Sequence, residues 1–334
     1  MSLKSARPSL FPNRRQLLAG LALAPLTACA SGPGFRASGA DQTITEQPVL
    51  HVITTRKLAK EGKASPFLDA SRSPRLAYHR ARLRPPDQST LGRIGSYVSN
   101  GDYSVAALEP QPGEAPTAFA ESLRGRPTLL FVHGYNQTFE SAAYDAALLG
   151  DSIGFRGNVA LFTWPSRAGL LDYGYDRESA LIARDPFADA LAAVTQDPFG
   201  ARLHLVAHSM GTLVALEALR MHWDRHGEKG MDRIGAVVFA APDIDADVFR
   251  AGLEKIGPMR EKMTVITATN DRALDLSRRL AGGDRVGALP AKALAGLGIR
   301  VIDATDFASG LIRHDVFVSN ADVRAAIQRA VQRA

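Results

Sequence analysis

Apolar and polar positions follow two different patterns along this 334-residue chain. Between residues 48 and 116, short apolar runs such as 49–55 and 103–110 are separated by polar, proline-rich stretches, which predicts strands joined by loops. From residue 128 onward, runs of buried-strand character alternate with segments of helical spacing. This alternation is typical of a parallel sheet covered by helices on both faces, so we predict an α/β fold. The N-terminal strands are expected to extend the same sheet, and a separate small N-terminal domain is the alternative.

The regular part of the chain predicts its elements in order. The expected strands are residues 128–134, 158–165, 202–208, 233–242, 262–269 and 298–305. The segments with helical spacing are 139–155, 178–196, 212–219 and a last helix that ends at Ala334. Pro186 lies inside the second of these segments, so the helix is expected to bend or to start there. The stretch between Pro242 and Lys262 is too short for a large cap domain.

The first 28 residues have the pattern of an export signal. Arg14 and Arg15 precede the apolar run Leu17–Leu26, which is too short to span a bilayer as a helix. The paired arginines resemble a twin-arginine signal. The sequence Leu-Thr-Ala-Cys that ends at Cys29 resembles a bacterial lipobox, in which the cysteine becomes the lipidated first residue of the mature protein.

Cys29 is the only cysteine, so the chain has no intrachain disulfide. We predict that residues 1–28 are removed, that lipidated Cys29 anchors the protein to a membrane of the bacterial cell envelope, and that residues 29–47 form a flexible tether. Residues 48–334 then form the folded domain. Ala30 after the cysteine favours the outer membrane, with the domain on the periplasmic side. An ordinary signal peptide with an unmodified thiol is the alternative.

The formal net charge of the whole chain is +6, and much of it comes from the predicted export signal. Four positive charges and no acidic residue lie within residues 1–28, so the rest of the chain carries about +2. That balance gives no reason to expect a nucleic-acid partner.

Ser209 lies where the strand 202–208 gives way to a helical pattern, in the sequence Val-Ala-His-Ser-Met-Gly-Thr. A nucleophile elbow has the pattern G-x-S-x-G, in which small flanking residues let a sharp turn expose the serine. Gly211 matches this pattern, whereas Ala207 replaces the first glycine. Ser209 is therefore a candidate nucleophile. The alternative is a helix N-cap, a position that favours serine.

A serine nucleophile needs a general base, and position excludes most of the histidines. His222 lies about 20 Å along the helix that Ser209 opens, at 1.5 Å per residue, and His226 lies farther still. His208, next to the serine, should point to the other side of the turn, and His133 belongs to a different motif. His314, after the last strand, remains. Three further histidines lie in or beside strand-like runs and are not chosen as the base: His51, His79 and His204.

The acid of the triad is expected between Ser209 and His314, because an α/β-hydrolase has the chain order nucleophile, acid, histidine. Asp271 follows the strand 262–269 and is preferred; it would orient the histidine and stabilise its cationic form. The alternative for Asp271 is a plain turn aspartate. Asp243, after the preceding strand, is the reserve candidate.

Two backbone N–H groups are expected to form the oxyanion hole, which stabilises the negative charge of a tetrahedral intermediate. The Met210 N–H follows the nucleophile directly. The Tyr135 N–H lies in the sequence Phe-Val-His-Gly-Tyr-Asn, where Gly134 permits a close approach of the backbone. His133 in this motif is expected to be structural rather than a proton carrier.

Several of these segments together resemble a bacterial family of esterase/lipase-like α/β-hydrolases whose function is largely uncharacterised. The motifs are FVHGYN, FTWPS, YGYDRESA, LVAHSMGT, AAPDIDADVF, NDRALDLSRRL and the late His314. The resemblance spans residues 52–318 and is densest from Phe131 onward. It implies the α/β-hydrolase fold and supports Ser209, Asp271 and His314 as the triad.

The remaining patterns add little to this picture. His222 and His226 share a helix face, but no acidic pattern of the metalloprotease kind accompanies them, so no metal is predicted. Gly-rich phosphate loops and clustered cysteines are absent from the sequence, so no cofactor is predicted. An aromatic segment after the strand 158–165 either lines a substrate pocket or covers the sheet edge; its candidate pocket residues are Trp164, Tyr173 and Tyr175.

We therefore expect a membrane-anchored serine hydrolase that acts on carboxylic esters of small-molecule or lipid substrates through an acyl-enzyme. Thioester or amide cleavage is a second chemical alternative, because a triad does not distinguish among these bonds. The alternative of another class is a catalytically inactive lipoprotein that uses the same fold as a binding or scaffolding module.

Overall fold

Nine strands form one sheet in the computed structural model of the protein, which describes residues 47–60, 67–85, 103–111, 116–169, 171–307 and 320–334. In chain order the elements of the described residues are β1 Val49–Leu58, β2 Leu68–Arg84, β3 Ser104–Pro110, α2 Pro116–Ser122, β4 Thr128–Val132, α3 Phe139–Ser152, β5 Asn158–Thr163, α4 Tyr173–Thr195, β6 Leu203–His208, α5 Gly211–Met231, β7 Ile234–Ala240, α6 Ala246–Lys255, η3 Gly257–Lys262, β8 Met263–Thr267, α7 Arg272–Ala281, η4 Val286–Ala288, η5 Ala291–Leu294, β9 Arg300–Asp303, η6 Thr305–Phe307 and α9 Ala321–Arg333.

The strand order across the sheet is β3-β2-β1-β5-β4-β6-β7-β8-β9. From β1 to β9 all neighbouring strands are parallel, whereas β2 pairs antiparallel with β1 and with β3. The last residue of β4, Val132, lies opposite Ala207 of β6 and Phe162 of β5. The loops that leave these three strands therefore start side by side, at the edge where open parallel sheets build their sites.

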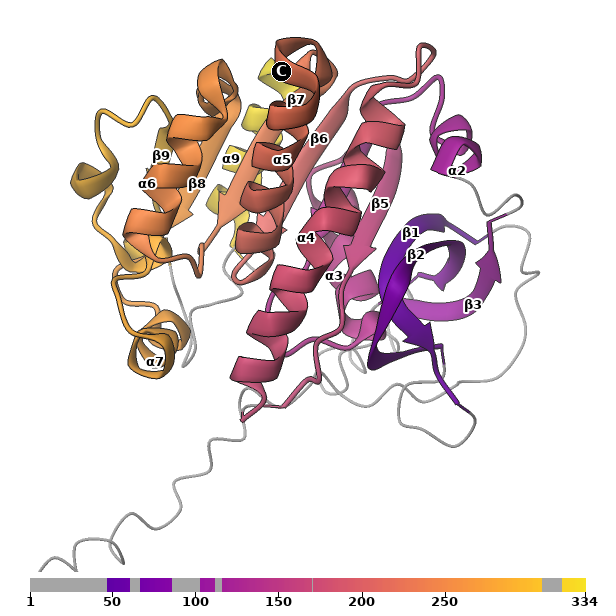
Figure 1. Cartoon of the computed structure of the whole chain (residues 1–334), viewed down its shortest axis with the longest axis horizontal. Coiled ribbons are helices and arrows are strands. Elements are labelled where there is room, and N and C mark those ends of the chain that lie inside the picture. Colours follow the sequence, from indigo (N-terminus) through magenta and orange to yellow (C-terminus); the bar gives the residue numbers. More distant parts are fainter. Residues whose placement is uncertain (1–46, 61–66, 86–102, 112–115, 170, 308–319) are drawn as a thin grey trace, which may run out of the picture. The chain divides into compact units, whose positions relative to one another are not determined.

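The central strands are buried on both faces, which explains their continuous apolar sequences. Every residue of β4, β6, β7 and β8 is buried. One apolar core includes residues of α4, α5 and α6, and a second core includes residues of α3 and α9. Figure 1 shows these two groups of helices on opposite faces of the sheet. The arrangement confirms the predicted α/β-hydrolase fold, a mostly parallel sheet covered on both faces.

Helix α4 differs from its predicted extent. The helix begins at Tyr173, five residues before the segment with helical spacing, and continues through Pro186 to Thr195. Pro186 is therefore inside the helix and does not start it. The burial of Phe187 helps to hold the helix on the sheet, because its ring stacks on Phe162 of β5 with centroids 4.2 Å apart.

The three N-terminal strands belong to the same sheet as the regular part of the chain. β1 pairs in parallel with β5, so that Thr54 lies opposite Thr163, the last residue of β5. Their hydrogen bond joins the Thr54 hydroxyl, as donor, to the Thr163 carbonyl at 3.0 Å. β1 therefore ends at the same edge as β4, β5 and β6.

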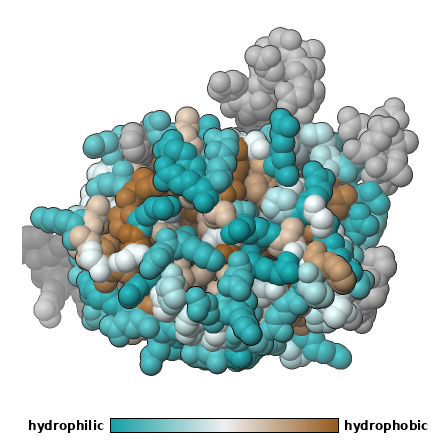
Figure 2. Space-filling model, turned by 90° about the horizontal axis from the view of Figure 1, so that it is seen from above, coloured by the Kyte–Doolittle hydropathy of each residue, from teal (hydrophilic) through white to brown (hydrophobic). Residues whose placement is uncertain are grey.

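The segment from Pro242 to Lys262 forms the short elements α6 and η3. Among the described residues, no helix combines the length and the apolar character that a membrane crossing requires. Figure 2 shows one end of the molecule, where the described surface is mainly hydrophilic and apolar patches lie between the polar side chains.

Candidate active site

Ser209 lies between β6 and α5 in a backbone conformation that an L-residue adopts rarely. Its φ angle is +50°, in the left-handed region. Backbone hydrogen bonds hold this conformation. The Ser209 N–H donates to the carbonyl of Ala240 in β7 at 3.0 Å, and the Ser209 carbonyl accepts from the N–H groups of Thr212 in α5 at 3.0 Å and of Asp243 after β7 at 3.3 Å. A strained residue that its surroundings fix in this way is typical of a functional position.

Gly211 lets helix α5 begin directly against strand β4. A Cβ atom at this position would lie 2.2 Å from the His133 carbonyl oxygen and 2.8 Å from the Val132 carbonyl oxygen. Both obstacles are backbone, so a side chain would force the helix and the strand apart. Ala207, which replaces the first glycine of the elbow pattern, is fully buried within β6.

The loop that follows β4 reaches the elbow at Gly134. A Cβ atom there would lie 2.8 Å from the Ser209 Cβ and 3.1 Å from Nδ1 of His208. The backbone on either side of Gly134 therefore passes directly beside the serine side chain. The structure thus brings together the loop of Tyr135 and the serine, two parts that the sequence analysis expected to meet.

His133 is a buried neutral histidine that belongs to the scaffold of this loop. Its Nε2 lies 3.1 Å from the Trp164 N–H and 3.0 Å from the Thr163 hydroxyl, and its Nδ1 lies 2.8 Å from the Gly134 carbonyl oxygen. The N–H of Trp164 makes Nε2 an acceptor, so the ring proton lies on Nδ1 and is donated to Gly134. Burial, together with the charge of Arg56, lowers the pKa of His133 to about 3.

Asp271 follows β8 and caps α7. Its Oδ1 accepts hydrogen bonds from the N–H groups of Ala273 at 2.9 Å and Leu274 at 3.2 Å, and its side chain is buried. The cap fixes the direction of the carboxylate, so the turn and the triad interpretations of Asp271 are compatible. β7 lies between β6 and β8 in the sheet. Asp271 comes after the carboxyl end of β8, which is at the same edge of the sheet as Ser209.

Asp243, the reserve candidate, is bound on both carboxylate oxygens by other side chains. Oδ1 accepts a hydrogen bond from the Ser277 hydroxyl and lies 3.3 Å from Nε of Arg285 in a buried ion pair. Oδ2 accepts from the Tyr173 hydroxyl at 3.1 Å. This network joins β7, α4 and α7 through one carboxylate.

His314 lies in residues 308–319, outside the described residues, so its place in the triad stays a prediction. The chain approaches this segment beside the loop of Asp271. The Thr305 hydroxyl, just after β9, accepts from the Thr269 N–H at 3.0 Å, and the Thr305 carbonyl accepts from Nδ2 of Asn270 at 2.9 Å. The segment with the candidate base therefore begins three residues after Thr305, which is bonded to the acid loop.

His51 and His204 lie near the starts of β1 and β6, and His222 lies inside α5, so these three histidines are away from the edge of Ser209. Nε2 of His222 lies 3.1 Å from Oγ1 of Thr195 and 2.9 Å from the Gly230 carbonyl. Burial lowers the pKa of His51 and of His204 to about 4. Among the described residues, no group of three or more His, Cys, Asp or Glu side chains is arranged to hold a metal ion.

The candidate pocket residues lie in the scaffold beside the site. Trp164 is fully buried, stacks on His133 and donates its indole N–H to the His133 carbonyl at 3.0 Å. Tyr173 is buried, and its ring contacts Tyr135 edge-on. The Tyr175 ring is half-buried beneath the guanidinium groups of two arginines. A lining role for these three residues stays a prediction.

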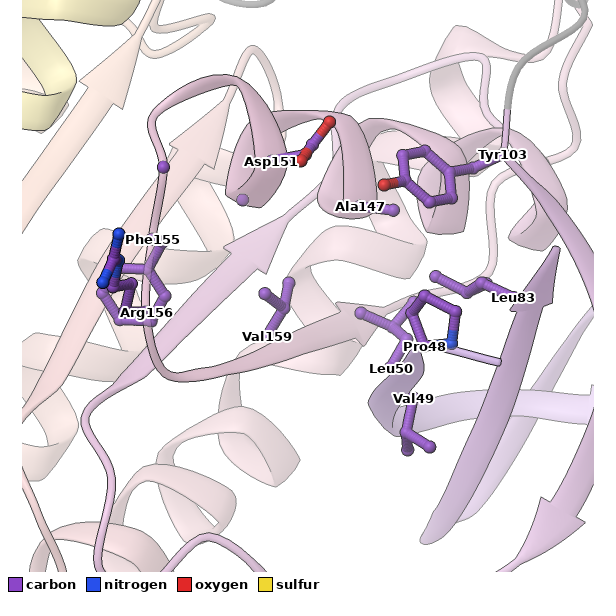
Figure 3. A pocket seen from close by; sticks show the side chains of 12 residues that line it. Pro48, Val49, Leu50, Leu83, Tyr103, Ala147, Asp151, Phe155, Arg156 and Val159 are labelled. Atoms are coloured by element: carbon purple, nitrogen blue, oxygen red, sulfur yellow. The ribbon is translucent and has the colours of Figure 1, made fainter. Parts of the chain in front are cut away.

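A cavity of about 330 Å³ lies among the described residues at the amino ends of the parallel strands, opposite the edge of Ser209. It is lined by residues at the starts of β1 and β5 and at the end of α3 (Figure 3). Tyr103, Asp151 and Arg156 supply its polar groups, and the remaining lining is largely apolar. Because Ser209 follows the carboxyl end of β6, this cavity is not the candidate active site.

A buried polar network lies behind the loop of Gly134 and was not predicted from the sequence. Its centre is Arg56, which is 3% exposed and comes from the end of β1. Asp176 of α4 is also fully buried and binds the loops after β4 and β5. Two features of the sequence could have indicated this network: Arg56 follows an apolar run, and Asp176 lies in the YGYDRESA segment.

The fold and this site define the class of α/β-hydrolases. Residues 112–332 match the model of a family described as alpha/beta hydrolase of unknown function (DUF900), and the chain belongs to that family. This result confirms the predicted resemblance to an uncharacterised α/β-hydrolase family. No protein of curated function matches the chain in sequence.

Solved structures that resemble the chain include esterases. Est1E from Butyrivibrio proteoclasticus is 11% identical and has a TM-score of 0.37, over 77% of this chain and 94% of that structure. The catalytic core domain of acetyl xylan esterase from Trichoderma reesei is 12% identical, with a TM-score of 0.38, over 62% and 97%. A Trichoderma reesei cutinase in complex with a phosphonate inhibitor is 18% identical, with a TM-score of 0.35, over 61% and 75%.

The close approach at Gly211 yields a prediction about stability. Gly211→Ala should destabilise the protein by roughly 2–4 kcal/mol, because its Cβ collides with the backbone carbonyls of Val132, at the end of β4, and of His133, just after it. Gly174→Ala on α4, where the new Cβ meets nothing within 4 Å, is the matched control and should be neutral or stabilising by about 1 kcal/mol. Urea denaturation measures both variants. Equal stabilities for the two variants would contradict the account of the elbow.

Proposed function

We propose that the protein is a serine hydrolase that cleaves carboxylic esters, with Ser209 as nucleophile, His314 as general base and Asp271 as the orienting acid. The observation that carries this proposal is the conformation of Ser209, held at a φ of +50° between a strand and a helix with Gly134 against its side chain. A plain helix N-cap has an extended backbone and needs neither feature. Membership of an α/β-hydrolase family supports hydrolytic activity.

In the proposed acylation step, Oγ of Ser209 attacks the ester carbonyl carbon while His314 takes the hydroxyl proton. The tetrahedral intermediate then collapses, its bond to the alcohol oxygen breaks, and the leaving alkoxide receives the proton from His314. The products of this half-reaction are a free alcohol and an acyl-Ser209 ester. In the second half-reaction, water adds to the acyl carbon, His314 shuttles its proton, and the carboxylic acid leaves with Ser209 restored.

The N–H groups of Tyr135 and Met210 would hold the oxyanion in both half-reactions. Met210 directly precedes α5, so its N–H lies at the positive end of this helix. The close approach of Gly134 to the Ser209 side chain supports the role of the adjacent Tyr135 peptide in this hole. Each such donor contributes about 10²–10³-fold to the rate in serine hydrolases.

The hydrogen-bond partners of the two aspartates support Asp271 as the acid. Asp243 binds Tyr173, Ser277 and Arg285 with its two oxygens, so its carboxylate is already committed to a network that joins α4 and α7 to the end of β7. Oδ1 of Asp271 accepts the two N–H groups of the α7 cap, which holds this carboxylate at the start of the helix. Asp271 is also in the loop that is bonded to Thr305, on the approach to His314.

The first test uses a fluorophosphonate probe, which forms a stable bond with an activated serine. We expect the wild type to be labelled and to hydrolyse short-chain nitrophenyl esters, and Ser209→Ala to lose both activities. Ser152→Ala, at the distant end of α3, is the matched control and should retain them. If the wild type is neither labelled nor active, the enzyme proposal is wrong, and the inactive binding module is the better account.

The second test separates the two candidate acids. Asp271→Asn should lower kcat by about 10⁴-fold with little loss of stability, because asparagine caps a helix as well as aspartate does. Asp243→Asn should destabilise the fold by about 3–5 kcal/mol, because it leaves the buried Arg285 without its counter-charge, while the folded protein keeps its kcat. Kinetics normalised to fluorophosphonate-labelled sites and thermal unfolding give the two readouts. The opposite pattern would assign the acid to Asp243.

Parallel assays would define the bond that is cleaved. Nitrophenyl esters, matched thioesters and matched anilides with one acyl chain differ only in the leaving group. We expect esters to have the highest kcat/KM, and a preference for the thioester or the anilide would replace the ester proposal by the corresponding one.

We also propose that the protein is exported and anchored through lipidated Cys29 on the periplasmic side of the cell envelope. The support is the apolar run after the paired arginines and the lipobox-like sequence before Cys29. Cys29→Ser should move the protein from the membrane fraction to the soluble fraction of fractionated cells. A variant that stays with the membrane would contradict the anchor.

A further inference from the structure

We propose that Arg56 is a positioning residue that holds the loop of the oxyanion hole from the N-terminal strands. Residues 49–58 form β1, outside the part of the chain that the family model matches. The inference rests on the proposed function for its catalytic consequence, and it gives β1 a specific task in that function.

The guanidinium group of Arg56 binds the two loops that follow β4 and β5. Nη2 donates to the Gln137 carbonyl at 2.8 Å, in the loop that begins with Gly134. Nη1 donates to the Ser166 carbonyl at 3.1 Å, in the next loop, and is 3.4 Å from the Asp69 carbonyl. One side chain therefore fixes the relative positions of two loops at the carboxyl edge of the sheet.

A chain of three hydrogen bonds leads from the same guanidinium to the proposed oxyanion donor. Arg56 Nε donates to Oγ1 of Thr163 at 2.8 Å. The Thr163 hydroxyl is 3.0 Å from Nε2 of His133, and Nδ1 of that ring donates to the Gly134 carbonyl at 2.8 Å. Each bond determines the orientation of the next group.

The last bond acts on the peptide unit that carries the Tyr135 N–H. The Gly134 carbonyl and the Tyr135 N–H belong to one planar peptide group, and in a trans peptide they point in opposite directions. When His133 fixes the carbonyl, it also fixes the direction of the N–H. A rotation of this peptide plane would turn the proposed donor away from the oxyanion, even if every other atom of the site stayed in place.

The charges around Arg56 reinforce this arrangement. Asp176 accepts hydrogen bonds from the N–H groups of Asn136 at 3.3 Å and Arg167 at 2.9 Å, one in each of the two loops. Asn136 itself has a φ of +61°, a conformation that requires such support. Burial lowers the pKa of Arg56 to about 10, while the nearby Glu140 and Asp176 oppose that shift, so the guanidinium stays charged at neutral pH.

β1 and β2 pair antiparallel and form the N-terminal hairpin, and a second arginine of this hairpin provides the matched control. Arg72 of β2 donates from Nε to Oγ of Ser179 at 2.9 Å and from Nη2 to the Tyr175 carbonyl at 2.9 Å. It therefore attaches the hairpin to α4, and its hydrogen bonds to described residues do not reach the loop of Gly134. A purely structural role for arginines of the hairpin predicts similar effects at Arg56 and Arg72.

The test compares Arg56→Lys, Thr163→Val and Arg72→Met in the full chain. Arg56→Lys keeps the charge but loses the fork of donors, and Thr163→Val interrupts the chain of bonds while the arginine stays in place. We expect kcat for a nitrophenyl ester to fall about 10²-fold in Arg56→Lys and about 10-fold in Thr163→Val. KM should stay within about threefold, because ground-state binding does not use the oxyanion donors. Arg72→Met should lower the Tm but leave kcat within about twofold.

Hydrogen–deuterium exchange of residues 133–138 gives a readout that does not depend on turnover. Exchange in this segment should be faster in Arg56→Lys and Thr163→Val than in the wild type, and unchanged in Arg72→Met. Unchanged exchange and unchanged kcat in the first two variants would overturn the positioning role, as would equal effects in Arg72→Met. A wild type without turnover or labelling would instead refute the proposed function, while faster exchange would still support the role of Arg56 in holding the loop.

Discussion

The close contact between the loop after β4 and the turn before α5 is the constraint on which the rest of the site depends. Gly134 lies against the Ser209 side chain, and Gly211 lies against the His133 carbonyl, so each glycine occupies a place where a Cβ would collide. This contact is geometrically feasible because β4 and β6 are neighbouring parallel strands whose ends are in register. Ser209 then takes its left-handed conformation, which backbone hydrogen bonds from β7 and from the start of α5 maintain.

Two buried ionic networks lie on either side of this contact, and each joins elements that are distant in sequence. On one side, Arg56 and Asp176 connect β1 and α4 with the two loops of the edge. On the other side, Asp243 connects β7 with α4 through Tyr173 and with α7 through Ser277. Buried charges are costly without partners, and both networks supply them at short range. We interpret both as devices that hold flexible connections at the site in one geometry.

Much of the fold and part of the site were predictable because they depend on local pattern. Continuous apolar runs identified the strands of the parallel sheet, and the small residues after β6 identified the turn at Ser209. The predicted start of α4 was wrong by five residues. Tyr173 and Asp176 are buried by tertiary contacts, and the sequence around them lacks the apolar spacing of a helix. Arg56 was missed for a related reason: in sequence, a charged residue near a strand end indicates solvent, and only the assembled loops show that it is buried.

A crystal structure of the protein after reaction with a fluorophosphonate tests the central claim most directly. The account predicts a bond between phosphorus and Oγ of Ser209, with one phosphoryl oxygen within about 2.7–3.1 Å of the N–H groups of Tyr135 and Met210. It also predicts His314 between the Ser209 oxygen and Asp271. A modified residue other than Ser209, or a phosphoryl oxygen directed away from both N–H groups, would contradict it.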